Sequence, residues 1–127
     1  YLSGNTKLYG RLSTRELLTI AGNIYGLPEN VIHARIEEIA QILSLEDFID
    51  NRIEKLSTGQ TQRASISRCL IHSPKLYIFD EPTSALDLES EEKMITMLRK
   101  YLKNRTCIII THRKAILNIC DKIIEFK

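Results

Sequence analysis

The sequence predicts an α/β fold in which a helical part is followed by a parallel sheet flanked by helices. Apolar residues recur at helical spacing through residues 13–55. From residue 56 onward, helical patterns alternate with two short apolar runs at 76–79 and 106–110. Near-continuous apolar strands that alternate with helices are typical of a parallel sheet covered on both faces. At 127 residues, the chain is at most one domain.

The helical part is expected to contain two helices and a short turn. Ser13 and Glu16 have the spacing of a capping box, so the first helix is expected to begin there. Gly26 permits a left-handed end to that helix, and Pro28 suits the first turn of the next one. Residues 45–49 are expected to fold back onto the second helix. The apolar faces are Leu17, Leu18, Ala21, Ile24 and Tyr25 in the first helix, and Ile32, Ile36, Ile39, Ala40 and Leu43 in the second.

The sheet part is expected to contain three strands. In order, we expect a helix at 59–72, a strand at 76–79, a helix at 88–103, a strand at 106–110, a short helix and a third strand at 121–126. Asp80 directly follows the first of these strands, and His112 closely follows the second. Because parallel strands place their carboxyl ends at one edge, both side chains are expected there, where α/β sheets build ligand sites.

Composition excludes several classes of function. The net charge of +2, from 18 basic and 16 acidic residues, is too even to suggest a nucleic-acid partner. The apolar runs are far shorter than the roughly 20 residues of a membrane helix. Cys69, Cys107 and Cys120 lack metal-ligand spacing, and we expect reduced, mostly buried thiols of a cytosolic protein. The chain begins with Tyr1 and no signal-like segment, so we expect it to start within a longer protein.

Two adjacent carboxylates form the most informative pattern. Asp80 and Glu81 end a buried strand and precede Pro82. Adjacent side chains at a strand end can point in different directions, so the two acids can take separate roles. In phosphoryl transfer, one such acid holds Mg²⁺ and a second orients the attacking water. The pattern therefore indicates a phosphoryl-transfer site.

A second pattern precedes the helix at 59–72. Ser57, Thr58, Gly59 and Gln60 are small or polar residues at its beginning. Backbone amides without a helical acceptor at this positive end make a site suited to a phosphate. Ser57 by itself is better explained as an ordinary N-cap. The short spacing to the acidic strand end favours the phosphate site.

Together these residues resemble the ATP-binding-cassette (ABC) ATPase family. Residues 56–60 match the family signature Leu-Ser-Gly-Gly-Gln, with Thr58 in place of its first Gly. Asp80 falls at the Walker B acid and Glu81 at the catalytic glutamate. Residues 84–87 match the D-loop, and His112 matches the switch histidine. The resemblance covers essentially the whole chain in the right order, and it implies a partial P-loop NTPase fold of ABC type.

The resemblance divides the chain into three regions. Residues 1–12 would hold the Q-loop, residues 13–55 the helical subdomain, and residues 56–127 the signature, Walker B, D-loop and switch-histidine part of the catalytic core. The cofactors implied are ATP and Mg²⁺. The partners implied are a second ATPase subunit, paired head to tail, and membrane-spanning transporter subunits. The location implied is the cytoplasmic face of the cell membrane. No nucleic-acid partner is implied.

The resemblance also implies a role for each motif residue. Asp80 would hold the Mg²⁺ shell, and Glu81 would orient the attacking water. His112 would contact the γ-phosphate on its own side. Ser57, Thr58, Gly59 and Gln60 would lie at the γ-phosphate of the ATP held by the partner, and Asp87 would act across the interface between the subunits.

The sequence departs from the family in two places. No Gly-x-x-x-x-Gly-Lys-Ser/Thr P-loop occurs in the 127 residues, so this fragment alone is expected to bind ATP weakly and not to hydrolyse it. Gly4 stands where the Q-loop usually has Gln. The stretch around Gly4, together with residues 8–12 and 25–27, is similar to the ATPase subunits of sodium-extrusion and related bacterial exporters.

Two alternatives to a transporter subunit stay open. One is a soluble ABC ATPase, such as a DNA-repair or ribosome-associated protein. Repair types place a long coiled coil before the signature, whereas residues 13–55 form a compact helical stretch, which favours the transporter. The other is a truncated module that binds a partner without hydrolysing ATP. A P-loop encoded upstream of Tyr1 would exclude this second alternative.

Overall fold

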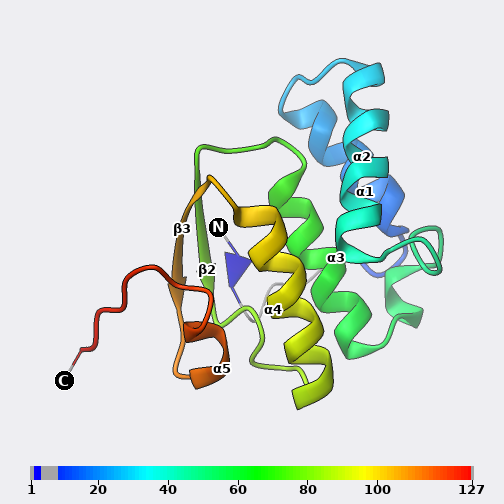
Figure 1. Cartoon of the computed structure of the whole chain (residues 1–127). Helices are drawn as coiled ribbons and strands as arrows, with labels where there is room; N and C mark the ends of the chain where they lie inside the picture. The colour runs from blue at the N-terminus through cyan, green and yellow to red at the C-terminus, as the bar shows by residue number, and fades with distance from the viewer. Residues whose placement is uncertain (1, 4–8, 127) are drawn as a thin grey trace.

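A computed structural model describes residues 2–3 and 9–126 of the chain (Figure 1). The expected Q-loop position, Gly4, lies outside the described residues. In chain order the elements are β1 (Leu2–Ser3), α1 (Thr14–Ile24), α2 (Glu29–Leu43), the 3-10 helix η1 (Ile53–Lys55), α3 (Thr58–Leu70), β2 (Leu76–Asp80), α4 (Leu88–Leu102), β3 (Thr106–Ile110) and α5 (Lys114–Leu117). The α/β class and the predicted helices and strands up to residue 117 are confirmed.

The sheet has three parallel strands in the order β1-β2-β3. β2 is the central strand, and its last residue, Asp80, is paired with Ser3 on one side and Ile110 on the other. Tyr77 and Phe79 of β2 are buried against the helices. The strand is therefore anchored by two aromatic side chains, and its carboxyl end is held between two neighbours.

Helices α3 and α4 lie on the same face of the sheet (Figure 1). The other face carries Leu76, Ile108 and Ile110, which are 47%, 51% and 53% exposed. The prediction of a sheet covered on both faces is thus wrong for the described residues. Both crossovers, from β1 to β2 and from β2 to β3, step in the same direction along the sheet. Because such connections are right-handed, both place their helices on the same side.

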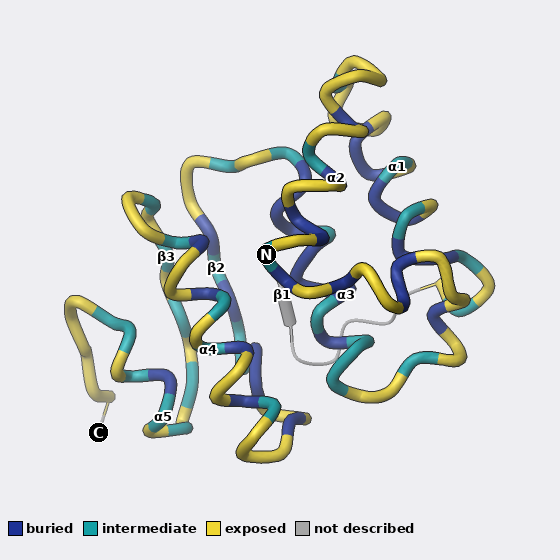
Figure 2. The backbone as a smooth tube through the Cα atoms, turned by 45° about the vertical axis from the view of Figure 1, so that its right-hand side comes forward, coloured by how far each residue is buried: buried dark blue, intermediate teal, exposed yellow. Residues whose placement is uncertain are grey.

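Residues 121–126 do not form the predicted third strand. They are exposed throughout, with Ile124 67% and Phe126 95% exposed (Figure 2). Apolar, β-prone residues form a strand only where they pair with a neighbouring strand, because strand stability comes from the partner. The short helix α5 instead turns back beside α4 and buries Ile116, and the chain beyond it pairs with no described strand.

The helical part is built on the contact between α1 and α2. Leu18 and Ile36 are fully buried, as their helical spacing predicts. Gly22 allows the two helices to approach closely, because a Cβ at this position would lie 2.7 Å from Cγ1 of Ile32. Ile24 and Tyr25 were expected on the apolar face of the first helix, but they are 77% and 55% exposed. Both lie at the end of α1 after the close approach at Gly22, and the Tyr25 ring stacks on His72 with the ring centres 3.9 Å apart.

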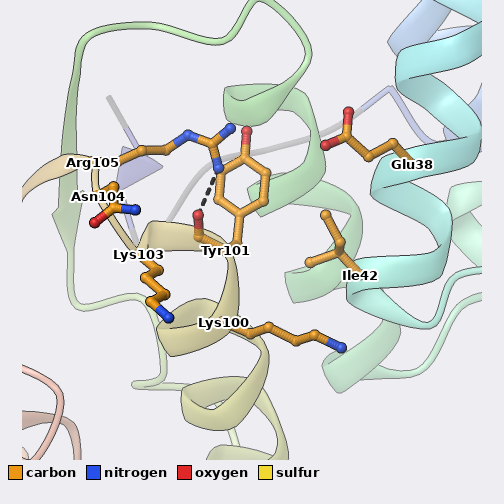
Figure 3. Close-up of a pocket in the computed structure, with 7 residues that line it drawn as sticks. All are labelled: Glu38, Ile42, Lys100, Tyr101, Lys103, Asn104 and Arg105. Carbon is orange, nitrogen blue, oxygen red and sulfur yellow. Dashed lines mark hydrogen bonds between the residues drawn. The ribbon is translucent and has the colours of Figure 1, made fainter.

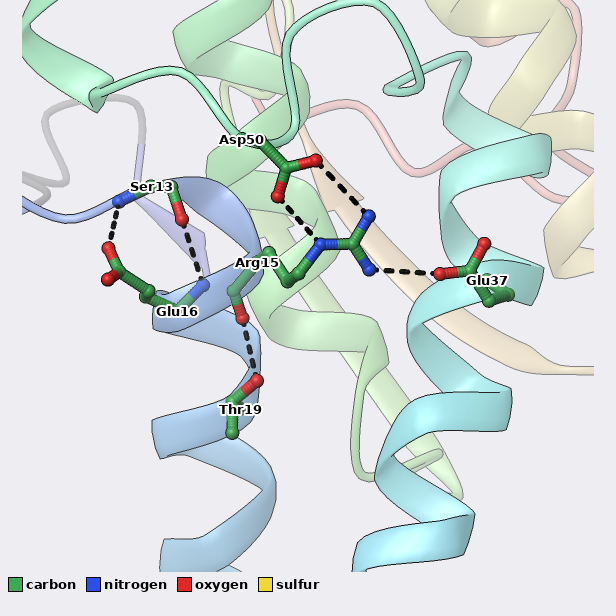
Figure 4. A network of polar contacts seen from close by, with 6 residues as sticks. All are labelled: Ser13, Arg15, Glu16, Thr19, Glu37 and Asp50. Atoms are coloured by element: carbon green, nitrogen blue, oxygen red, sulfur yellow. Dashed lines mark hydrogen bonds and ion pairs between the residues drawn. The ribbon is translucent and has the colours of Figure 1, made fainter.

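The capping box at the start of α1 is formed as predicted (Figure 4). The Glu16 amide donates to Ser13 Oγ at 3.1 Å, and the Ser13 amide donates to Glu16 Oε2 at 2.8 Å. In the same turn, Arg15 donates to Asp50 at 2.7 Å and to Glu37 on α2 at 2.9 Å. These bonds raise the pKa of Arg15, the bond to Asp50 contributing most. They tie α1, α2 and the returning chain together.

The two ends of the helical part lie side by side. Ile53 donates its amide to the Leu12 carbonyl at 2.9 Å, and Glu54 donates to the Gly10 carbonyl at 3.0 Å. Ser13 and Arg52 form an antiparallel bridge. The helical part therefore leaves and rejoins the rest of the fold at one place, as an inserted subdomain does.

The three cysteines are thiols rather than disulfides, as expected. Cys69 is buried as expected, whereas Cys107 and Cys120 are only half-buried. Burial raises the pKa of Cys107 to about 12, which keeps this thiol protonated. Within the described part of the chain, no helix combines the length and apolar character that crossing a membrane would require.

Candidate active site at the carboxyl edge of the sheet

The strands β2 and β3 end together, so Asp80 and the residues after Ile110 lie at one edge, as predicted. The Glu81 amide donates to the Ile110 carbonyl at 2.8 Å and extends the ladder by one residue. Glu81 itself has a φ of 50°. A non-glycine residue in the left-handed region is strained, and such strain is concentrated at functional sites. The backbone thus turns the Glu81 side chain toward β3 immediately after the strand.

Glu81 is held by the two residues that follow β3. The backbone amide of His112 donates to Glu81 Oε1 at 3.1 Å, and His112 Nδ1 lies 2.7 Å from the same oxygen. The Thr111 hydroxyl donates to Oε2 at 3.3 Å. An ionised carboxylate only accepts, so Nδ1 carries the hydrogen and Nε2 faces away from Glu81. The structure therefore joins the two predicted catalytic residues directly.

The predicted phosphate-binding segment begins helix α3. Ser57 is the N-cap, and its Oγ accepts from the Gln60 amide at 3.2 Å, while Gln60 Oε1 accepts from the Ser57 amide at 3.0 Å. The amides of Thr58 and Gly59 belong to the same first turn, where a helix has no carbonyl of its own to receive them. The first turn contains no acidic residue, so the positive end of the helix dipole is not neutralised.

Gly59 is not required by the packing of this chain. A Cβ at this position would lie 3.8 Å from Leu86 Cδ2 and from Ser90 Oγ, which is ordinary van der Waals contact. A small hollow of about 100 Å³ between α3 and α4 is lined by Gly59, Leu86 and Ser90 among others. The absence of a side chain at Gly59 thus leaves open space at the beginning of α3.

Two clusters of predicted site residues are formed rather than one. Asp80, Glu81 and His112 lie at the sheet edge, and residues 57–60 lie at the start of α3. Among residues 9–126, no hydrogen bond joins residues 57–60 to Glu81 or His112. The clusters are connected through Gln62 of α3, which is buried and donates through Nε2 to the Pro82 carbonyl. Sequence reasoning missed this role of Gln62, because no residue near it along the chain identifies its partner.

Asp87 is the N-cap of α4. Its Oδ2 accepts from the Ser90 amide at 3.3 Å. Hydrogen bonds from Ser90 lower the pKa of Asp87, so the carboxylate stays ionised at neutral pH. Asp87 therefore has a structural role within this chain in addition to the predicted one at the interface between subunits.

A polar network behind the edge was also missed from the sequence. Arg113 pairs with Glu91 of α4 at 3.1 Å, and Glu91 accepts from the Thr83 hydroxyl at 2.6 Å. Glu91 and Thr83 are buried. A charged residue at Glu91, one turn into α4, looks like a solvated helix residue until the structure supplies its partners.

The carboxyl edge of the sheet supplies one carboxylate suited to Mg²⁺. Protein sites for this ion commonly supply one or two carboxylates and leave the other positions to water and phosphate. Asp80 presents such a carboxylate at the end of the central strand, half-exposed. Among the described residues, no group of three or more His, Cys, Asp or Glu side chains could hold a metal by itself. The donor set therefore suits an ion shared with a nucleotide.

A larger pocket, of about 410 Å³, lies away from these clusters (Figure 3). It is an open depression between α2 and the end of α4, with Lys100, Lys103 and Arg105 on one side and Glu38 on the other. Arg105 donates to the Tyr101 carbonyl at 2.6 Å, and its guanidinium lies 4.0 Å from the centre of the Tyr101 ring. These cations complement the negative end of α4. The pocket includes none of the predicted site residues.

Comparison with known proteins connects both clusters to one family. The family model described as "ABC transporter" matches residues 1–84. The chain is 32% identical over 123 residues to the ABC transporter ATP-binding protein NatA of Bacillus subtilis, covering 95% of this chain and 50% of that protein. It is 36% identical over 121 residues to the macrolide export ATP-binding/permease protein MacB of Azoarcus sp., covering 94% and 18%. It is 31% identical over 122 residues to the methionine import ATP-binding protein MetN of Clostridium acetobutylicum, covering 94% and 38%. The chain thus spans half or less of the length of these relatives.

Proposed function

The chain belongs to the ABC transporter family, and from this premise we propose that it forms part of an ATP-hydrolysing subunit that powers transport across a membrane. The observation that carries the proposal is the contact of Glu81 with His112 and Thr111 at the end of the central strand. The relatives named above include an export and an import protein, so their names favour neither direction. The similarity to sodium-extrusion-type exporters is proposed from the sequence alone.

We propose that Glu81 orients the attacking water. A carboxylate offers about four lone-pair positions. The described donors use two on Oε1, from His112, and one on Oε2, from Thr111. One position on Oε2 then remains for a water, and the side chain is 25% exposed. The donors hold Glu81 in place and leave it able to accept a proton from that water as it attacks.

His112 is proposed to contact the γ-phosphate. Its Nδ1 is engaged by Glu81, and its side chain is 80% exposed, so Nε2 is accessible to a ligand. Asp80 is proposed to hold the hydration shell of Mg²⁺, an ion that would neutralise phosphate charge during transfer. Both residues lie at the edge where Glu81 is held, which supports a common site.

The start of α3 is proposed to bind the γ-phosphate of an ATP held by a second, head-to-tail subunit. Ser57, Thr58, Gly59 and Gln60 would provide this surface, with Asp87 near it. Two observations support the proposal: the first turn lacks acidic residues, and the open space at Gly59 has no explanation in the packing of this chain. A phosphate that approaches the backbone closely would account for both.

Helix α1 is proposed to dock on a membrane-spanning subunit. Its exposed end presents Ile20, Ile24 and Tyr25, which are 44%, 77% and 55% exposed. An apolar group of this kind next to a rigidly held helix is suited to a protein partner. This arrangement would hold the subunit at the cytoplasmic face of the cell membrane.

The test is Glu81→Gln in the complete gene product. This substitution keeps the size and the hydrogen-bonding shape but removes the charge that orients and activates the water. We expect ATP hydrolysis to fall at least about a hundredfold, within the range typical of general-base assistance. ATP binding is expected to survive, and an ATP-loaded dimer is expected to accumulate. Steady-state phosphate release and size-exclusion chromatography in ATP and Mg²⁺ measure both effects.

The matched variant is Asp80→Asn at the neighbouring position. It weakens the Mg²⁺ shell, so we expect nucleotide affinity to fall together with turnover. Turnover of Glu81→Gln within a few-fold of the parent would exclude Glu81 from catalysis. A gene without an upstream P-loop would instead favour the truncated, partner-binding alternative.

A further inference from the structure

The three residues after β3, Thr111 to Arg113, contact two different parts of the site. We call them the switch segment. Thr111 and His112 hold the Glu81 carboxylate. Arg113 points the other way, toward residues 84–87, which we call the D-loop, and toward the first turns of α4. Consecutive residues of one short segment therefore connect the catalytic carboxylate to the loop that follows it.

The Arg113 guanidinium makes three described bonds. Nη2 donates to the Ser84 carbonyl at 2.9 Å, and Nη1 donates to the Leu86 carbonyl at 3.1 Å. Nη1 also lies 3.1 Å from Glu91 Oε2. A planar guanidinium with donors in a fixed fork can satisfy such a set, whereas a lysine ammonium is a point charge on a flexible stem. The three acceptors together define one position for the D-loop backbone.

Glu91 makes this anchor rigid. Its side chain is 3% exposed, and its other oxygen accepts from Thr83, which is fully buried. A buried carboxylate is tolerated only with its hydrogen bonds satisfied, so this geometry has little freedom. Arg113 is therefore fixed from the α4 side.

We propose that Arg113 is a positioning residue that couples the D-loop to Glu81, an inference that rests on the catalytic role proposed above. A displacement of residues 84–87 moves two of the three acceptors of Arg113, the Ser84 and Leu86 carbonyls, and with them the switch segment. Because Thr111 and His112 hold Glu81, the carboxylate then leaves the position in which it orients water. A partner subunit that seats the D-loop would thereby set the catalytic geometry.

A second connection between the D-loop and Glu81 runs along the chain, through the turn at residues 81–86. The Ser84 amide donates to the Glu81 carbonyl at 3.2 Å, and the Leu86 amide donates to the Thr83 carbonyl at 3.0 Å. The D-loop is thus linked to Glu81 along the chain as well as through Arg113. The link along the chain reaches Glu81 through its backbone, whereas the link through Arg113 reaches the Glu81 carboxylate by way of Thr111 and His112.

The experiment compares Arg113→Lys with Arg15→Lys in the complete gene product. Arg15 is the matched control, since it also joins separate elements through three described hydrogen bonds, far from the sheet edge. The first readout is hydrogen exchange in residues 82–87, where every residue except Pro82 carries a backbone amide hydrogen. The second is the separate measurement of kcat and KM for ATP. A variant Arg113→Met/Glu91→Leu, which replaces the buried pair by apolar groups, serves if Arg113→Lys does not fold.

For Arg113→Lys we expect faster exchange in residues 82–87 and a fall in kcat of about ten- to a hundredfold, the effect of a misplaced catalytic group. KM is expected to change much less than kcat, because Arg113 itself is not proposed to contact ATP. Arg15→Lys is expected to leave both readouts at the parent value. Parent-like exchange in residues 82–87, or a parent-like kcat, overturns the coupling. If the parent itself does not hydrolyse ATP, the proposed function fails, and the exchange result still decides whether Arg113 holds the D-loop.

Discussion

Helices α1 and α3 begin with the same capping box but in different surroundings. In α1, Ser13 is buried and its partner is the carboxylate of Glu16. In α3, Ser57 is exposed and its partner is the neutral amide of Gln60. The hydrogen bonds are equivalent, at 2.8 and 3.1 Å in α1 and at 3.0 and 3.2 Å in α3. A carboxylate neutralises the positive end of α1, whereas the amide leaves that of α3 available to an anion.

The glycines of the two helices differ in the same way. Gly22 of α1 is required because a Cβ would lie 2.7 Å from Ile32, whereas Gly59 of α3 has room for one. In α1, every choice of residue at these positions is explained by neighbours in the same chain. In α3, packing against neighbours in the described part of the chain does not explain Gly59, which is why we propose a ligand there. The two helices thus begin with the same local structure. Their surroundings distinguish Gly22, which packing requires, from Gly59, which packing does not require.

The largest expected effect comes from exchanging the capping partner in α3. Gln60→Glu keeps the capping box and the fold, but it places a carboxylate where the phosphate is proposed to bind. At about 4 Å, and with the effective dielectric of a protein surface, two such charges repel by about 4 kcal/mol. We expect ATP hydrolysis by the complete gene product to fall about a hundredfold or more, with the unfolding free energy unchanged or slightly higher. Phosphate release and urea unfolding measure the two.

A different result would contradict the distinction drawn here between the beginnings of α1 and α3. A Gln60→Glu variant that hydrolyses ATP at the parent rate would show that the start of α3 faces no anion. The space left at Gly59 would then need another explanation.

A smaller effect is expected from adding a methyl group to each glycine. Gly22→Ala forces Ile32, which is 2% exposed, out of place. Overpacking of this kind costs about 1–3 kcal/mol, partly offset by the better helix propensity of alanine, so we expect a net loss of about 1–2 kcal/mol. ATP hydrolysis is expected to stay normal. Urea unfolding, with Ile32→Ala as the partner in a double-mutant cycle, measures the coupling between the two positions.

Gly59→Ala is the counterpart in α3. The new methyl group meets only ordinary contacts, so stability is expected to stay the same or to rise by up to about 1 kcal/mol. Hydrolysis is expected to fall, though by less than in Gln60→Glu, because the methyl group hinders close approach of a phosphate to the backbone without adding a charge. If Gly59→Ala instead unfolds the protein as Gly22→Ala does, the two glycines have the same packing role.

The smallest effect is expected from Glu16→Gln in α1, the reverse of the exchange in α3. The capping bond to the Ser13 amide survives, and only the favourable interaction of the carboxylate with the helix dipole is lost. That interaction is worth about 0.3–1 kcal/mol at an exposed position. We expect a decrease of this size in the free energy of unfolding, measured in urea at low salt, and an unchanged ATPase rate. A large loss of activity would mean that α1 contributes to the nucleotide site.

Much of the fold could be predicted because its signals are local. Helical spacing identified the buried faces of α1 and α2, and the apolar runs identified β2 and β3. Two predictions were wrong for tertiary reasons. The segment 121–126 has strand-like residues but pairs with no described strand, and the sheet is covered on one described face because both crossovers have the same hand.

The candidate site also contains residues that the sequence could predict and residues that it could not. Motif spacing was enough to nominate Asp80, Glu81 and His112, because parallel strands bring their carboxyl ends to one edge whatever the details of packing. It could not reveal Gln62 or the pair formed by Arg113 and Glu91, since nothing in their neighbours along the chain identifies their partners.

The sequence by itself determined where each helix and strand of the site begins and which charges follow each strand, since capping, helical spacing and strand ends depend on residues a few positions apart. Only the tertiary structure decided how those charges are satisfied. Glu81 finds His112 31 positions further along the chain, and Arg113 reaches the Leu86 carbonyl across 27. Such bonds depend on the angle at which the strands and α4 pack, and that angle is set by the buried side chains between them rather than by any short segment.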